Sequence, residues 1–198
     1  IMSRNAIDIF ASQFLDKLDK LDHPPTREEK FMTSILLKNI YDLCNDAELI
    51  ARKNPKSENL VNHPLYKISK PYLKSFYSDD FFIESEECGI VPDWEVIDSF
   101  NNDKFNDSCR IYMVIKKNVL NNPKIHDSIV NRDRKYFIDN FESLFENIPF
   151  SEYFGGLKKF LEDETLCSLD DQEIVWSYFE VFTDLFINED EYISSLPK

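Results

Sequence analysis

The sequence predicts an all-α fold, an irregular bundle of six to seven helices with a proline-broken middle segment. Apolar residues recur at intervals of three and four over most of the 198 residues, which is the spacing of amphipathic helices. Only three residues are Gly, whereas Rossmann folds, phosphate-binding loops and turn-rich β-sandwiches depend on glycine at fixed turns. With 42% hydrophobic and 14% aromatic residues, the chain can build one core, so we expect a single domain over residues 1–198.

A pair of helices is expected at the start of the chain. Apolar spacing predicts the first over Ser3–Leu21, and the prolines that follow end it because proline cannot continue the helical hydrogen-bond ladder. Thr26 and Glu29 have the spacing of a capping box, which starts a second helix that runs to about Lys53. The short connection predicts that the two helices are antiparallel.

Prolines divide the middle segment, residues 54–92. Short helical pieces are expected around 64–70 and 71–77, because the residue before a proline disfavours the helical conformation. Phe81-Phe82-Ile83 form a compact apolar plug, which we expect to dock on the core as a loop or a short strand. A sub-boundary within the domain, if the chain has one, is expected at 78–92.

The second half of the chain is also predicted to be helical. The apolar spacing over residues 93–119 favours a helix that is weakened at Asn101-Asn102. Arg110–Ile115 also suits a strand, because isoleucine and valine have stiff side chains. A further helix is expected from Asn122-Pro123 until Pro149 ends it.

The C-terminal part is expected to contain one strong helix. A short helical piece over Tyr153–Leu161 is expected to be interrupted at Gly155-Gly156. Ser168 has the position of a helix cap, and the apolar residues after it recur at helical spacing. We therefore expect an acidic C-terminal helix and tail over residues 168–198.

Charge is unevenly distributed along the chain, whose formal net charge is −14. Residues 161–198 contain eleven Asp or Glu and one Lys, whereas residues 52–74 contain six Lys or Arg and one Glu. One interpretation is a set of solvated faces that keep the protein soluble. The other is that the basic middle binds an acidic partner or the acidic end of a neighbouring copy. The acidic balance disfavours nucleic acid as a partner.

No pattern of catalytic or cofactor-binding residues is present. The three histidines are isolated, the four cysteines form no CxxC pair, and no acidic stretch has the glycine and glutamate of an EF-hand loop. We therefore expect a non-enzymatic protein with no cofactor and no bound metal. No apolar run approaches the length of a membrane span and no secretory signal is visible, so an intracellular protein without membrane contact is expected.

A protein-binding surface is expected on the basic middle and on nearby aromatic residues, because aromatics are prominent in interface cores. The lysines have the i, i+3 and i+7 spacing of one helix face. The candidate residues are Lys67, Lys70, Lys74, Tyr72, Tyr77, Phe81, Phe82 and Trp176. The alternative is that the aromatic residues pack inside the domain, since aromatics also dominate folding cores.

Four short motifs occur in a characteristic order: Asn54-Pro55-Lys56, Pro71-Tyr72, residues 80–84 (DFFIE) and residues 174–178 (IVWSY). In this order they resemble a family of short, acidic, helical proteins of unknown function from nucleocytoplasmic large DNA viruses. The resemblance covers about half of the chain and is interrupted by a long stretch between Ile90 and Leu166. It implies an all-α fold and a viral origin, and it supplies no catalytic residues.

These observations predict a helical protein-binding module, which would be a viral structural protein (a minor capsid or assembly component) or an accessory protein. Its expected partners are capsid proteins or copies of itself, in the cytoplasm of an infected cell and in the virion. One alternative is a bundle that binds host proteins and regulates apoptosis by holding an amphipathic partner helix. Another is a metal-dependent enzyme that uses scattered carboxylates.

Overall fold

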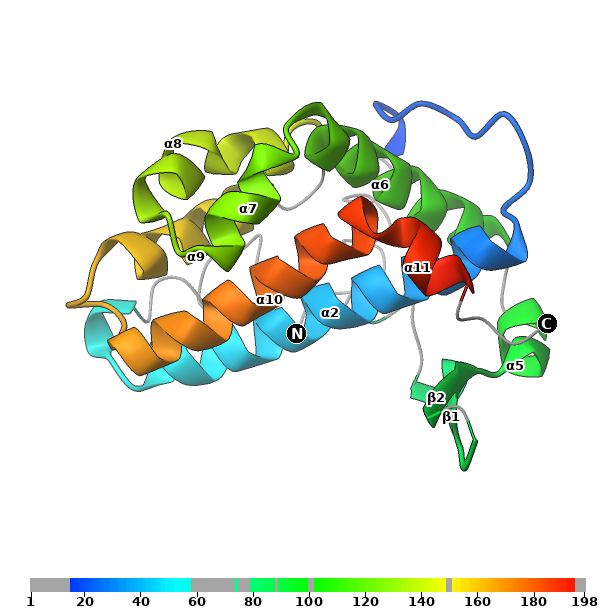
Figure 1. Ribbon diagram of the computed structural model, residues 1–198, viewed down its shortest axis with the longest axis horizontal. Coiled ribbons are helices and arrows are strands. Elements are labelled where there is room, and N and C mark those ends of the chain that lie inside the picture. The colour runs from blue at the N-terminus through cyan, green and yellow to red at the C-terminus, as the bar shows by residue number, and fades with distance from the viewer. Residues whose placement is uncertain are drawn as a thin grey trace.

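Two long helices, α2 (Arg27–Arg52) and α10 (Leu169–Ile187), lie side by side and antiparallel and form the spine of the bundle (Figure 1). The computed structural model describes residues 15–57, 74, 79–87, 89–99, 102–148 and 151–194, and it confirms the all-α class. The capping box before α2 is confirmed, because Glu29 N donates to Thr26 Oγ1 and Thr26 N donates to Glu29 Oε1, both at 3.2 Å. Ser168 caps α10 as predicted, accepting from Asp171 N at 3.2 Å.

The other helices of the described residues surround this pair. They are α5 (Trp94–Ser99), α6 (Asn102–Asn121), α7 (Lys124–Val130), α8 (Arg134–Leu144), α9 (Ser151–Glu162) and α11 (Glu189–Ser194). Helices α6, α7, α8 and α9 gather on one side of the α2–α10 pair, and α11 continues from the end of α10 (Figure 1). The described residues therefore form eight α-helices, against the six to seven expected.

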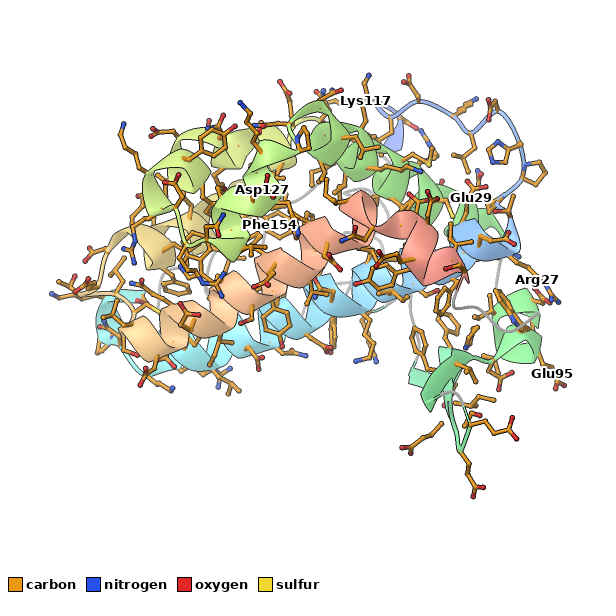
Figure 2. All side chains as sticks on the ribbon, viewed as in Figure 1. Arg27, Glu29, Glu95, Lys117, Asp127 and Phe154 are labelled. Atoms are coloured by element: carbon orange, nitrogen blue, oxygen red, sulfur yellow. The ribbon has the colours of Figure 1, made fainter. Side chains whose placement is uncertain are left out.

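A small hairpin forms where the apolar plug was expected. Phe81 ends a 3₁₀ turn, η2 (Asp79–Phe81), and is fully buried; strands β1 (Phe82–Ser85) and β2 (Gly89–Pro92) then pair antiparallel, with Phe82 opposite Pro92. Asp93 N closes the hairpin by donating to the Phe81 carbonyl at 2.7 Å. The predicted plug is confirmed in part: Phe81 docks on the core, Phe82 is partly buried at the start of a short strand, and Ile83 is 49% exposed. The hairpin and α5 lie together at one end of the bundle, where Arg27 meets α5 (Figure 2).

The core is rich in phenylalanine and is centred on α10. Phe179 is fully buried and its ring contacts those of Phe137 and Phe141 from α8, both at 5.5 Å between centroids. Phe145 stacks on Phe154 of α9 at 4.0 Å and 8°. Edge-to-face and offset contacts of this kind add to the free energy gained by burying apolar area, so α10 binds α8 and α9 through one continuous aromatic layer.

The predicted first helix is wrong at its C-terminal end. Its residues 3–14 lie outside the described residues, and from Asp16 to Thr26 the chain forms turns and irregular structure. The Arg110 guanidinium from α6 explains this end, because it donates to the carbonyls of Leu15, Leu18 and Asp19, the last two at 2.6 and 3.1 Å. The helical pieces expected at 64–70 and 71–77 also lie outside the described residues, apart from the helical Lys74.

Three further expectations about the second half are corrected. The helix expected over 122–149 is two helices, since Arg132 takes a left-handed conformation (φ 53°) and Asp133 caps α8 by accepting from Tyr136 N at 3.3 Å. Helix α9 passes through Gly155-Gly156 without a break, and a Cβ added at Gly155 would meet no atom within 4 Å. The strand alternative for Arg110–Ile115 is wrong, because these residues lie inside α6.

Candidate functional site

The structure gives only part of the expected basic surface. Lys67, Lys70, Tyr72 and Tyr77 lie outside the described residues. Lys74 is exposed and its Nζ lies 5.3 Å from the ring centre of Tyr41 on α2, a cation–π contact. The predicted row of three lysines on one helix face is therefore not tested.

The three described aromatic candidates do not form one exposed surface. Phe81 is fully buried and Trp176 is 3% exposed, while Phe82 is partly buried against Phe31 at 6.4 Å between ring centroids. Phe81 and Phe82 lie in the hairpin region, whereas Trp176 lies on α10 against Phe137 at 4.8 Å. For Phe81 and Trp176 the structure favours the alternative interpretation, that they pack inside the domain.

Part of the charge separation along the sequence disappears in the folded chain. Lys53, from the basic middle, pairs with Asp171 of α10 at 3.1 Å, and Lys116 of α6 pairs with Glu189 of α11 at 2.7 Å. The NPK motif also joins these regions, since Asn54 Nδ2 donates to the Thr165 carbonyl at 2.6 Å. Bases and acids that are distant in sequence thus neutralise one another within one molecule.

One polar cluster has the residue types of a catalytic triad, with a histidine between a threonine and an aspartate, but no substrate could reach the threonine. His126 Nδ1 lies 2.7 Å from Thr183 Oγ1, and His126 Nε2 lies 3.8 Å from Asp184 Oδ1. Thr183 is fully buried, and its hydroxyl also donates to the Phe179 carbonyl at 3.0 Å. A nucleophile must reach its substrate, so this cluster joins α7 to α10 and is not a candidate active site.

The described cysteines do not have the character of nucleophiles. Cys44, Cys109 and Cys167 are free and buried. Burial raises the pKa of both the Cys109 and the Cys167 thiol to about 11, so both stay protonated at neutral pH. Within the described residues, no group of three His, Cys, Asp or Glu side chains could hold a metal ion.

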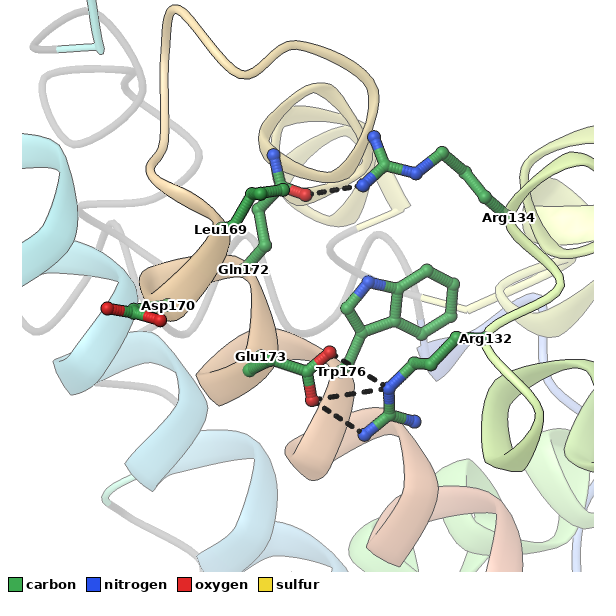
Figure 3. Close-up of a pocket in the computed structure, with 7 residues that line it drawn as sticks. All are labelled: Arg132, Arg134, Leu169, Asp170, Gln172, Glu173 and Trp176. Atoms are coloured by element: carbon green, nitrogen blue, oxygen red, sulfur yellow. Dashed lines mark hydrogen bonds and ion pairs between the residues drawn. The ribbon is translucent and has the colours of Figure 1, made fainter.

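The clearest candidate site is a pocket of about 260 Å³ between the α7–α8 turn and the first turns of α10 (Figure 3). We call it the two-arginine pocket. It is lined by Arg132, Arg134, Leu169, Gln172, Glu173 and Trp176, with Asp170 on the side opposite the arginines. The capping of α8 by Asp133 places the two arginines on either side of one turn, both facing α10.

The charge of Arg132 is paired with carboxylates of α10, and its guanidinium also donates to the Ile129 carbonyl of α7. Its Nε and one terminal nitrogen donate to the Glu173 carboxylate at 3.1–3.3 Å, another terminal nitrogen donates to Glu180 at 3.4 Å, and its guanidinium lies 5.4 Å from the ring centre of Trp176. Partial burial lowers the Arg132 pKa, but the two carboxylates outweigh this effect and raise it. Arg132 thus forms a wall of the pocket and is already neutralised.

Arg134 has a different environment. It donates to Gln172 Oε1 at 2.6 Å, and Gln172 is 1% exposed and donates in turn to the Cys167 carbonyl at 3.2 Å. No carboxylate among the described residues pairs with Arg134. Its guanidinium is therefore held in place by a neutral, fixed amide.

The outer face of α10 is a second notable surface. Ile174 and Val181 are 40% and 45% exposed although they are large apolar residues, and they lie seven residues apart on the same side of the helix. Asp170 and Ser177 occupy exposed positions of the same stripe. Sequence analysis named Trp176 from the pocket but missed the rest of the pocket and the outer face of α10. Apolar residues occur on several sides of α10, so only packing decides which of them are buried.

Comparison of the chain with protein-family models, with curated proteins and with solved structures found no match. No helix among the described residues is long and apolar enough to cross a membrane. The function is therefore argued from the surfaces of the molecule itself.

Proposed function

We propose that the protein is a non-enzymatic helical module that binds another protein through the outer face of α10. The observation that supports this most directly is the exposure of Ile174 and Val181 on one stripe of a helix whose opposite side is buried in the core. Large apolar side chains left in water on a rigid element mark interaction surfaces when they lie together. Helix α10 holds them rigidly, because it packs along α2 on one side and against α7 on another.

The charges around this face indicate the kind of partner. Asp170 lies on the stripe itself, and Asp190 and Glu191 are exposed on α11, which follows directly. Within the described residues none of these three carboxylates forms an ion pair. A partner segment that combines apolar residues with Lys or Arg would complement both features of the surface.

The viral resemblance extends this proposal to a class of protein. The IVWSY motif falls on α10 and includes Ile174, the residue that begins the exposed apolar stripe. Together with the resemblance of the other motifs, this supports a structural or accessory protein of a large DNA virus. Its partner would be a capsid protein or a second copy of the chain.

The test is affinity purification of the tagged protein from producing cells, with quantitative mass spectrometry. Ile174→Lys/Val181→Lys is compared with wild type and with Leu120→Lys, which changes an equally exposed apolar residue (48%) on α6. We expect one partner at near-stoichiometric yield with wild type and Leu120→Lys, and at least a tenfold loss with the α10 variant.

Sedimentation of the purified protein answers the question of self-association. Dimerisation that only the α10 variant abolishes would identify a second copy as the partner. Equal recovery of every co-purifying protein with the α10 variant, together with an unchanged monomer, would contradict the proposal.

A further inference from the structure

We propose that the two-arginine pocket binds a carboxylate group of a second molecule, an acidic side chain or a chain-terminal carboxylate that follows an apolar residue. This site borders the outer face of α10, which carries the proposed function, and Asp170 lies between the two. Arg134 and Trp176, which would hold the carboxylate, are not part of that face, so each proposal can fail without the other. Arg134 and Trp176 supply the hydrogen-bond donors of this site.

Arg134 supplies a cation that is positioned but not neutralised. A guanidinium has five N–H groups, and only one of those of Arg134 is used by a described residue, in the 2.6 Å bond to Gln172. Gln172 is buried and its amide is fixed at both ends, so it holds the guanidinium without satisfying its charge. A carboxylate is the geometric match for the remaining N–H groups, which can donate to it in pairs.

Trp176 supplies a second donor next to the first. Its indole nitrogen lies on the edge of the ring that faces Gln172 and Arg134 (Figure 3). No described residue accepts a hydrogen bond from this indole N–H, although the residue as a whole is only 3% exposed. A neighbouring donor pair of this kind offers one contact to each oxygen of a carboxylate.

The rest of the pocket favours a small anion with an apolar neighbour. Arg132 already pairs with Glu173 and Glu180, and Asp170 lies on the far side of the pocket, so Arg134 is the one cation lining the pocket that has no carboxylate partner among the described residues. One unpaired cation suits the single charge of a carboxylate better than the double charge of a phosphate. Leu169 at the rim is 58% exposed and offers an apolar contact for the residue beside the carboxylate.

The experiment uses the indole N–H signals in ¹H–¹⁵N spectra of the full chain. The sequence contains two tryptophans, so Trp94→Phe assigns the pair, and Trp94 serves as an internal reference at the other end of α2. The probes are N-acetyl-Leu-Glu-amide, N-acetyl-Leu-Leu with a free carboxylate, the uncharged N-acetyl-Leu-Gln-amide, and inorganic phosphate. The two acidic peptides distinguish a side-chain carboxylate from a terminal one.

We expect the Trp176 signal to shift with at least one acidic peptide, with a dissociation constant on the order of 1 mM, and not with the glutamine peptide. Arg134→Gln should weaken binding about tenfold or more. Arg134→Lys should bind with intermediate affinity, because lysine keeps the positive charge but lacks the paired N–H donors of a guanidinium. Arg27→Gln is the matched control, since Arg27 lies over the other tryptophan at 4.9 Å. It should leave binding unchanged.

Several outcomes would overturn the proposal. They are no shift with either acidic peptide at 10-fold the expected dissociation constant (about 10 mM), an equal shift with the glutamine peptide, a shift with phosphate alone, and undiminished binding by Arg134→Gln. An unchanged Trp94 signal in the two Arg134 variants shows that their fold is intact, and an unchanged Trp176 signal does the same for Arg27→Gln. Loss of the partner on the outer face of α10 has no bearing on these readouts, so the two proposals fail separately.

Discussion

Arg110 joins the N-terminal segment to α6, beside the buried side chains of Leu15 and Leu18. Its side chain is 10% exposed, and it donates to the carbonyls of Leu15, Leu18 and Asp19 while its charge pairs with Asp107 at 3.4 Å. Backbone carbonyls at the end of a helical turn have no partner inside the turn, so a cation that collects several of them acts as a cap. Donating to three separate carbonyls from one side chain requires the several N–H groups of a planar guanidinium, which lysine lacks.

Replacing Arg110 by methionine should lower the free energy of unfolding by about 2–4 kcal/mol, since several charge-assisted hydrogen bonds disappear together. Arg110→Lys should recover less than half of the loss. Arg52→Lys, a change in a 67% exposed residue with one i, i+4 pair, should stay within about 0.5 kcal/mol. Urea unfolding followed by far-ultraviolet circular dichroism measures the free energy of unfolding of all three variants. Equal effects of Arg110→Met and Arg52→Lys would show that the Arg110 hydrogen bonds contribute nothing to stability.

Local patterns account for the residues that sequence analysis placed correctly. Thr26, Glu29 and Ser168 act within one helical turn, so a window of four residues contains the whole interaction. Arg132 and Arg134 depend instead on residues of α10 that lie 38 to 48 positions further along the chain. Such pairings arise from packing and leave no trace in local spacing, which is why the pocket could not be predicted.

At the scale of elements, the aromatic layer binds α10 to α8 and α9. Phe179 is at its centre, with four phenylalanine rings at centroid distances of 5.5 to 6.3 Å. Because interiors are close-packed, a residue in this position cannot be shortened without leaving a cavity.

Phe179→Ala should therefore lower the free energy of unfolding by about 3–5 kcal/mol, and Phe179→Leu, which fills more of the same space, by about 1–2 kcal/mol. Ile174→Ala on the opposite, exposed face of α10 is the control and should change stability by less than about 0.5 kcal/mol. Chemical denaturation of the three variants gives the comparison. Similar losses for Phe179→Ala and Ile174→Ala would mean that the buried face of α10 has been assigned wrongly.

Helix boundaries were predicted correctly where a single sequence feature marked them. They were predicted wrongly where two features disagreed, such as helical apolar spacing and a turn or a pair of glycines. Ile125, Ile129, Phe137 and Phe141 keep helical spacing across the α7–α8 turn, so the spacing concealed the break that Arg132 and Asp133 make. At Gly155-Gly156 a break was predicted, but helix α9 continues through both glycines. A helical glycine costs about 1 kcal/mol relative to alanine, and burial of Phe154, Leu157 and Phe160 outweighs that cost in α9.

At the scale of the whole molecule, excess negative charge opposes folding. The net charge of −14 is spread over a chain of 198 residues, and the described ion pairs are mostly on the surface, where each contributes about 0–1 kcal/mol. Repulsion among the carboxylates that have no cationic partner acts over longer distances than the attraction within each ion pair.

We therefore expect the melting temperature to rise when NaCl is increased from 10 to 150 mM, because the Debye length falls from about 30 to about 8 Å. Asp190→Asn/Glu191→Gln should reduce this rise, and Lys117→Gln, which removes an exposed cation from α6, should enlarge it. Differential scanning calorimetry at the two salt concentrations provides the measurement. A melting temperature that falls with salt would show that ion pairs outweigh the repulsion.

The pairing of α2 with α10 also determines when this protein can fold during its synthesis. Arg52, the last residue of α2, is separated from Leu169 by 117 positions, and ribosomes add about 5–20 residues per second. The apolar face of α2, with Met32, Leu36 and Leu43, is thus synthesised about 6–23 s before synthesis of its partner helix begins. Helix α6, which also packs on α2, is synthesised within that interval, but the part of the apolar face of α2 that α10 covers stays exposed on the nascent chain until α10 is made.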